Sequence, residues 1–235
     1  MIKPIARKPP VQNLGDYVYQ QVREDIISLT VPPATHLREG ELAEQFSVSK
    51  TPVREALALL AQDGLVDLVA YRGAVVTSYT NTDLMEVYDL RGLVQGSCAR
   101  EAALTITADD LARLGVVIRQ SRQALDEGEL GQLPELFNAF DELIYRQTTN
   151  TRIRQIILNL DAHLRRIGNL TVRIPGRLEK SGEEHEQIYN AIVDRSPSEA
   201  ETLMRKHAAS VLADQLADHA VATSGRAALT DGERE

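Results

Sequence analysis

The sequence contains little of what several classes of protein depend on. It has no Trp, and aromatic residues make up 4% of the 235 positions. Proteins that bind single-stranded nucleic acid stack the bases on aromatic side chains, so this class is disfavoured. The one cysteine, Cys98, has no partner for an intrachain disulfide and lies within a helical pattern, which predicts a small buried residue without a chemical role.

Long apolar runs are also missing. No stretch of eighteen apolar residues occurs, and the N-terminal sequence MIKPIARKPP lacks the apolar core of a secretory signal. The sequence therefore predicts neither membrane insertion nor export, and we expect a cytoplasmic protein. With 43% apolar residues, the chain is long enough for one large domain or two smaller ones, each with a hydrophobic core.

The charge balance is acidic, with a formal net charge of −8. The excess is uneven, because residues 1–77 carry eight Lys and Arg against nine Asp and Glu, which leaves a net charge of −7 for the rest. Binding to duplex DNA depends on a local group of cations that reaches phosphates and releases counterions. An acidic total therefore weakens a DNA-binding interpretation without excluding it.

Residues 14–77 have the pattern of a winged helix-turn-helix domain. Apolar residues recur at helical spacing over residues 17–29, and a second short helix is indicated over residues 42–46. A turn at SVS follows, and then a third helix with its apolar face over residues 53–60, ended by Gly64. The stretch LVDLVAYRGAVVT predicts two short strands joined by a turn.

The rest of the chain predicts an all-helical second domain over residues 80–220, so the fold class is mainly α with a C-terminal helical bundle. Helical spacing indicates six segments, at residues 81–104, 108–127, 134–149, 152–170, 182–194 and 198–219. The two ends, residues 1–13 and about 222–235, lack such a pattern and are expected to be disordered.

The third helix of the first domain begins with an unusual group of residues. Lys50, Thr51 and Arg54 lie about a third of a turn away from its apolar face, and Pro52 occupies the first turn, where a missing N–H costs nothing. Ser49 or Thr51 is expected to cap the helix. This end offers cations, a hydroxyl and backbone N–H groups to phosphates and major-groove base edges, with Arg54 the expected reader of guanine.

The hairpin tip and the start of the second helix add further cations. Arg72 and Gly73 would form a wing that reaches the minor groove or a phosphate, and Arg38 is another candidate for a phosphate contact. The alternative is that these cations belong to an ordinary solvated surface, which is the more common case for an isolated helix.

The run LREGELAEQFSVSKTPVREALALLAQDGLVDLVAYRGAVVT resembles the DNA-binding domain of the GntR family of bacterial transcription regulators. The similarity lies in the patterns L-x-E-x-E-L-A, V-S-[RK]-T-P-V-R-E-A-L, D-G-L and R-G-A-x-V. It implies that Lys50, Thr51, Arg54 and Gly73 contact operator DNA. One departure is Ala34, which stands where the family usually has a glycine after proline, and we expect only a small change in that turn.

The second domain places polar residues on faces that should be buried. Arg91 and Gln95 fall within an apolar stripe, so Arg91 needs a carboxylate, a set of carbonyl groups or a ligand anion; an internal salt bridge is the alternative to a ligand. His185 and His207 also point inward, and Asp141 lies at the edge of another stripe. Two inward histidines in one small bundle indicate a metal or anion site, although a lone buried histidine is more often structural.

This domain resembles the FadR-like branch of the GntR family, whose helical FCD-type effector-binding domain often holds a divalent metal. The similar stretches are ELFNAFDELIYRQTTN, EEHEQIYNAI and AETLMRKHAASV. The family motif D-x-x-F-H-x-x-L supplies two ligands, but those positions here are Phe137 and Asp141. The resemblance implies a reduced ligand set for Zn²⁺, Ni²⁺ or Mn²⁺, namely Asp141, His185 and His207, with a metal-free pocket as the alternative. Gln95 replaces a glutamate that is frequent in the family.

These features together predict a homodimeric, ligand-responsive transcription regulator, more often a repressor in this family, which binds a pseudo-palindromic operator in double-stranded DNA. The effector implied by the resemblance is a small organic acid, bound among Arg91, Gln95, Asp141, His185 and His207. Two other interpretations remain open. One is a metal-dependent enzyme with an Asp/His/His site, and the other is a winged helix that binds proteins rather than DNA.

Overall fold

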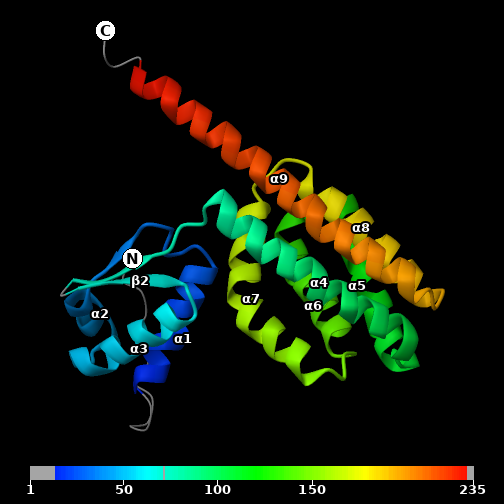
Figure 1. Ribbon diagram of the computed structural model, residues 1–235, viewed down its shortest axis with the longest axis horizontal. Helices are drawn as coiled ribbons and strands as arrows, with labels where there is room; N and C mark the ends of the chain where they lie inside the picture. Colours follow the sequence, from blue (N-terminus) through cyan, green and yellow to red (C-terminus); the bar gives the residue numbers. More distant parts are fainter. Residues whose placement is uncertain (1–13, 71, 232–235) are drawn as a thin grey trace. The chain divides into compact units, whose positions relative to one another are not determined.

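The computed structural model describes residues 14–70 and 72–231 (Figure 1). The predicted disorder of residues 1–13 and the turn residue Tyr71 lie outside this part. The chain forms two compact units, the first made of Met1–Ser78 with Ala162–Arg166, and the second of Tyr79–Asp161 with Ile167–Glu235. The break after Ser78 falls between the two domains that the sequence predicts, at residues 14–77 and 80–220.

The first unit contains the three predicted helices: α1 (Leu14–Ile27), α2 (Glu39–Phe46) and α3 (Lys50–Gln62). Helix α1 packs against α3, and buried side chains from both helices form the core of the unit, among them Val18, Ile26, Val53, Leu57 and Leu60. Ser47 adopts a left-handed conformation after α2, and the N–H of Val48 donates to the carbonyl of Ala43. This bond closes the tight turn that sets the direction of α3.

A small antiparallel sheet completes the first unit, with strands in the order β1-β3-β2. The predicted hairpin is formed by β2 (Val66–Val69) and β3 (Gly73–Val76), with Val66 opposite Val76. The third strand, β1 (His36–Leu37), is not predicted from the sequence. Two residues are too few to display an alternating pattern, and β1 exists because β3 offers its second edge.

The turn before β1 bears out the interest of Ala34. Its φ is 63°, in the left-handed region that favours glycine, and its N–H donates to the carbonyl of Val76 at 2.9 Å. A residue with a Cβ pays about 1–2 kcal/mol in this conformation. The departure from the family pattern therefore keeps the backbone of the turn and adds strain to it.

The second unit is all-helical, as predicted. Its elements are α4 (Asn81–Thr105), α5 (Ala108–Glu127), the short 3-10 helix η1 (Leu130–Gln132), α6 (Leu133–Tyr145), α7 (Thr151–Thr171), α8 (Arg177–Val193) and α9 (Pro197–Asp231). Helix α4 begins with a capping box, in which Thr80 and Asp83 bond each other's backbone N–H groups. Helices α4 and α9 lie side by side along much of their length (Figure 1).

Three helix boundaries differ from the prediction. Helix α6 ends at Tyr145 rather than near Thr149, and α8 begins at Arg177 rather than near Gly182, directly after Gly176 with its φ of 74°. The expected disorder from residue 222 is wrong up to Asp231, because α9 continues to that residue. No proline occurs after Pro197 to interrupt that helix.

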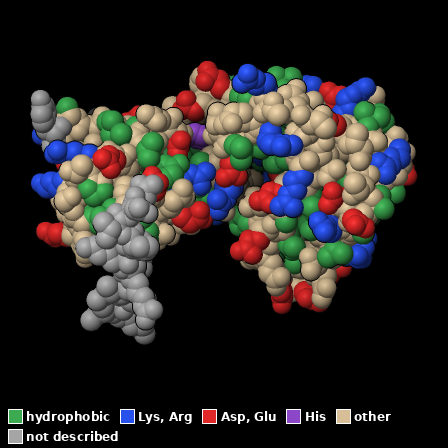
Figure 2. All heavy atoms as spheres, turned by 90° about the horizontal axis from the view of Figure 1, so that it is seen from below, with side chains coloured by type: hydrophobic (Ala, Val, Ile, Leu, Met, Phe, Trp, Pro, Cys, Tyr) green, Lys and Arg blue, Asp and Glu red, His purple; other side chains and the backbone are tan. Residues whose placement is uncertain are grey.

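The second unit buries a core of small and aliphatic side chains that includes Cys98, which is fully buried. Burial raises the pKa of the Cys98 thiol to about 12, in agreement with a structural rather than a reactive residue. On the face seen in Figure 2, acidic and basic side chains are intermixed over this unit. None of the helices in the described part of the chain is long and apolar enough to span a membrane.

Candidate functional site

The start of α3 presents polar side chains on a hydrophobic support. Lys50, Thr51 and Arg54 are exposed, whereas Pro52 and Val53 between them are buried. Ser49 is the N-cap residue, with extended backbone, but its side chain makes no capping hydrogen bond, so the predicted side-chain cap is wrong. The first backbone N–H groups of α3 are therefore left without that internal acceptor.

Two of the predicted DNA-binding cations are held by carboxylates of α2. Arg54 Nε donates to Glu39 Oε2 at 2.8 Å, and Arg38 Nη1 donates to Glu41 Oε1 at 2.9 Å. The Arg54 side chain is 66% exposed and that of Arg38 is 70% exposed. Exposed pairs of this kind contribute roughly 0–1 kcal/mol, so a phosphate or a base edge can replace the carboxylate at small cost.

The wing residues have different roles. Arg72 is exposed at the hairpin tip, as predicted. Gly73 is buried, its φ is 100°, and a Cβ added to it would lie 2.1 Å from the carbonyl oxygen of Leu37. The predicted DNA contact of Gly73 is thus replaced by a structural requirement, because only glycine allows β1 to pass so close to the wing.

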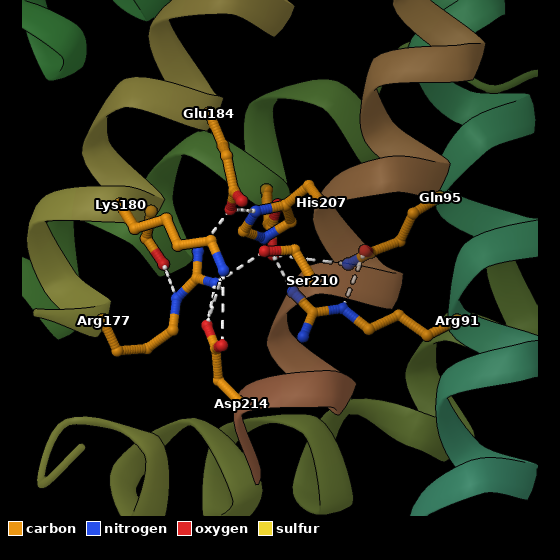
Figure 3. A network of polar contacts seen from close by, with 10 residues as sticks. Arg91, Gln95, Arg177, Lys180, Glu184, His207, Ser210 and Asp214 are labelled. Atoms are coloured by element: carbon orange, nitrogen blue, oxygen red, sulfur yellow. Dashed lines mark hydrogen bonds and ion pairs between the residues drawn. The ribbon is translucent and has the colours of Figure 1, made fainter. Parts of the chain in front are cut away.

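The second unit contains a buried polar network built on two arginines (Figure 3). The first is Arg91 of α4, which was expected to need a partner. Its Nε donates to Gln95 Oε1 at 2.8 Å, and its Nη2 lies 3.5 Å from Asp141 Oδ2 on α6. Gln95 Nε2 also donates to Asp141 Oδ2 at 3.3 Å and to the Tyr145 hydroxyl. The alternative of an internal ion pair for Arg91 is therefore realised.

The second arginine, Arg177 of α8, is fully buried and was not predicted. Its Nη1 donates to Ser210 at 2.8 Å and to Asp214 at 2.7 Å, both on α9, and its Nη2 forms an ion pair with Glu184. Lys180 lies 2.9 Å from the same Asp214 carboxylate. Sequence spacing held a signal, since residues 177, 181 and 184 share one helical face, but the helix was expected to begin after Arg177.

His207 of α9 connects to this second cluster. Its Nδ1 donates to Glu184 Oε2 at 2.7 Å. Burial lowers the pKa of His207, while the Glu184 hydrogen bond and charge oppose that shift. For Glu184 itself, burial acts to raise the pKa, but hydrogen bonds from His207 and Ser210 and the charges of His207 and Arg177 outweigh it, so its pKa is lowered. The pair is therefore a neutral imidazole donating to a carboxylate.

His185 is held by aromatic rings instead of hydrogen bonds. Its ring stacks on Phe140 with centroids 4.4 Å apart, meets Phe137 edge-on at 4.7 Å and lies 4.7 Å from the ring of His207. It is 2% exposed, and neither ring nitrogen has a hydrogen-bond partner. Burial lowers the pKa of His185 well below its usual value, and the nearby charges of His207, Arg91 and Arg177 lower it further.

The predicted metal ligands do not form a ligand set in this arrangement. Asp141 Oδ2 is bonded to Arg91 and Gln95, His207 Nδ1 is bonded to Glu184, and the ring of Phe137 lies against His185. Over the described residues, no group of three or more His, Cys, Asp or Glu side chains is placed to hold a metal ion. The residues present therefore fit a metal-free polar site better than a metal centre.

A pocket of about 330 Å³ leads to this network between α8 and α9. Its lining combines charged residues with the two polar side chains deepest in the network: Lys180, Glu183, Glu184, Gln187, Leu203, Lys206, His207 and Ser210. The volume is of the size that small metabolites occupy. The site thus offers guanidinium and imidazole groups to a small polar ligand.

A winged helix-turn-helix with an exposed cationic helix tip, joined to a helical unit with a buried polar site, defines a class of ligand-responsive DNA-binding regulators. The chain belongs to the GntR family of bacterial regulatory proteins. Residues 14–76 match the family model "Bacterial regulatory proteins, gntR family", and residues 86–210 match the FCD domain model.

Individual relatives agree with this assignment. The chain is 28% identical over 198 residues to the HTH-type transcriptional repressor RspR of Escherichia coli, covering 84% of this chain and 87% of the relative. It is 32% identical over 178 residues to the gluconate operon transcriptional repressor of Bacillus licheniformis, covering 74% of this chain and 70% of the relative. The solved structure of McbR/YncC of E. coli has the same fold, with a TM-score of 0.70 at 20% identity, over 88% of this chain and all of that one.

The protein is thus a transcription regulator, and the enzyme alternative is set aside because the relatives are regulators rather than enzymes.

Proposed function

We propose that this protein is a repressor of the FadR-like branch that acts in the bacterial cytoplasm by binding a pseudo-palindromic operator. The observation that carries the proposal is the tip of α3, where Lys50, Thr51 and Arg54 stand exposed on a buried apolar face. In this proposal Arg54 reads a base edge in the major groove, while Arg38 and Arg72 contact phosphates. The repressor names of two relatives support the sign of regulation.

The helical unit is proposed to bind a small organic acid that changes operator affinity. Support comes from the buried arginines and histidines of Figure 3, which converge from α4, α8 and α9 on one small region. One relative is named for the gluconate operon, and gluconate is an organic acid. An effector shifts DNA binding only by its differential affinity for the two conformations of the protein.

A homodimer is proposed to form through the exposed face of α4. Leu90, Leu93 and Leu104 lie on that face and are 38%, 54% and 60% exposed. Glu86 and Arg100 lie on the same side, equally far along the helix on either side of Leu93. Antiparallel pairing of two copies about Leu93 would therefore place opposite charges against each other and cover the leucines.

The DNA-reading part is tested with an operator selected from a randomised duplex library and measured by fluorescence anisotropy. Arg54→Ala is compared with Arg146→Ala, a matched control in the helical unit that is also ion-paired and 63% exposed. The proposal predicts that only Arg54→Ala weakens operator binding. Equal affinity of both variants and the unaltered protein would show that the α3 tip does not read DNA.

The regulatory part is tested by the same anisotropy measurement in the presence of organic acids that bind the protein in calorimetry. An acid that binds at the polar site should change operator affinity, and Arg91→Lys should weaken that response because lysine lacks the forked geometry of the guanidinium. If every acid that binds leaves operator affinity unchanged, the protein is not regulated through this site.

A further inference from the structure

The Arg91 end of the polar network contains buried atoms whose hydrogen-bonding capacity is unused. Asp141 Oδ1 has no hydrogen-bond partner, and neither has either ring nitrogen of His185. Native proteins rarely leave such atoms unsatisfied, and where they do, a ligand is a frequent reason. These three atoms lie on α6 and α8, beside the guanidinium of Arg91 on α4.

The unused atoms define the chemistry of a complementary ligand. An ionised Asp141 only accepts hydrogen bonds, so the group that meets its Oδ1 must be a donor such as a hydroxyl. A ligand carboxylate at that position would be repelled by the like charge. The Arg91 Nε and Nη2 groups are taken by Gln95 and Asp141, while no bond is recorded for its Nη1 among the described residues, which leaves a donor for a carboxylate.

The formal charges of the network limit how many carboxylates it admits. Arg91, Arg177 and Lys180 are matched by Asp141, Glu184 and Asp214. Each carboxylate brought by a ligand is then in excess, and a buried excess charge is costly. A ligand with one carboxylate and one or more hydroxyl groups fits this balance better than a dicarboxylate.

A metal ion does not supply the missing partners. Phe137 occupies one position of the ligand motif and packs edge-on against His185, and Asp141 at the other position is engaged by Arg91. His207 donates through Nδ1 to Glu184. No metal-ligand group of three side chains occurs in the part of the chain that the structure describes.

We propose that the site binds a hydroxy monocarboxylic acid directly and without a metal ion, with Asp141 accepting a hydrogen bond from the ligand hydroxyl and Arg91 holding the ligand carboxylate. His185 contributes one donor and one acceptor at the same end. The inference rests on the proposed function in one respect, namely that the effector binds in this network.

Calorimetry on the full-length protein in EDTA tests the ligand class with matched pairs of acids. The pairs are glycolate and acetate, L-lactate and propionate, and D-gluconate and hexanoate. In at least one pair the hydroxy acid should bind about tenfold tighter or more than its deoxy counterpart, a difference of about 1.4 kcal/mol, with the same affinity in the presence and absence of EDTA. Equal binding within every pair, loss of binding in EDTA, or no binding of any acid would overturn the proposal.

Two variants at Asp141 separate recognition from simple structural support. Asp141→Asn and Asp141→Ala should each reduce the preference for the hydroxy acid about tenfold, and both should tighten binding of the deoxy acid because the like charge is gone. A merely structural role would weaken both acids alike, and that result would contradict the proposal. Circular dichroism identifies a variant that fails to fold, and the other variant then decides.

The metal question is tested by restoring the family motif. The double variant Phe137→Asp with Asp141→His should retain Zn²⁺ or Ni²⁺ after loading and desalting, by elemental analysis, whereas the unaltered protein should lose it. Near-stoichiometric metal in the unaltered protein would refute the metal-free site. Operator anisotropy is read separately: a hydroxy acid that binds as expected but leaves operator affinity unchanged would end the regulatory proposal and leave this inference intact.

Discussion

Replacement of Arg54 is the change that most directly examines how the protein meets DNA. In the free protein its guanidinium is 66% exposed and pairs with Glu39 at 2.8 Å. A bidentate contact from arginine to a guanine edge contributes about 1–3 kcal/mol of discrimination, so Arg54→Ala should weaken operator binding about 5- to 150-fold. The stability of the fold should change by less than about 1 kcal/mol, because an exposed ion pair contributes no more than that.

The Glu39 carboxylate supplies a companion measurement with the opposite sign. Operator binding must exchange the Arg54–Glu39 pair for a DNA contact, so Glu39→Gln should tighten the operator complex by up to about fivefold, which corresponds to the 0.2–1 kcal/mol of an exposed pair. Fluorescence anisotropy with the operator and with an unrelated duplex, over a series of salt concentrations, distinguishes base reading from phosphate contact. Arg54→Ala should act mainly on the operator, whereas a phosphate contact lowers both affinities and the salt dependence. If Arg54→Ala weakened both duplexes equally, Arg54 would be a phosphate contact and the assignment of a base reader would be wrong.

Four further predictions concern stability and assembly. Ala34→Gly should raise the free energy of unfolding by about 0.5–1 kcal/mol in urea denaturation, since relief of left-handed strain exceeds the added entropy of the unfolded chain; Ala58→Gly within exposed α3 should lower it by about 1 kcal/mol. Arg177→Met should destabilise the helical unit by about 3 kcal/mol in thermal melts, because it strands the carboxylates that face the buried guanidinium, and an unchanged melt would mean that the network is not closed in solution. The lowered pKa of Glu184 implies stability that is present above pH 4.5 and lost as the pH falls through its folded value, so acid melts of Arg177→Met should show a smaller loss. Leu93→Glu should give monomers in light scattering if two copies pair through α4, whereas an unaltered mass would place the interface elsewhere.

The first unit could be predicted well because its sequence states each step locally. Apolar spacing, the SVS turn and Gly64 define α2 and α3, and the exposed position of Arg54 follows from the helical period. The strand β1 could not be predicted, since it depends on pairing with β3 rather than on its own two residues. The role of Gly73 also depended on that pairing, because the approach of Leu37 is a tertiary feature.

The polar site of the second unit was predicted in kind but not in its partners. Helical spacing placed Arg91 and His207 inward correctly, since both are buried. It could not show that Asp141 serves Arg91 and that Glu184 serves His207, because each pair joins different helices. Arg177 was missed for a local reason: the start of α8 at Gly176 has no side-chain cap that the sequence would reveal.

The two departures from the family motif gain a common explanation from these contacts. Positions 137 and 141 are one helical turn apart on α6, so a carboxylate at both would place like charges at neighbouring sites without a metal to neutralise them. With Phe137 at the first position, the single carboxylate of Asp141 is neutralised by Arg91 instead, and the Phe137 ring packs against the edge of His185. Restoring an aspartate at position 137 alone would therefore add repulsion and remove an aromatic contact, whereas restoring both residues of the motif replaces the acceptor by a second metal ligand. A metal site is regained only when both positions change together, and the direct recognition of a ligand hydroxyl by Asp141 is what that double change would remove.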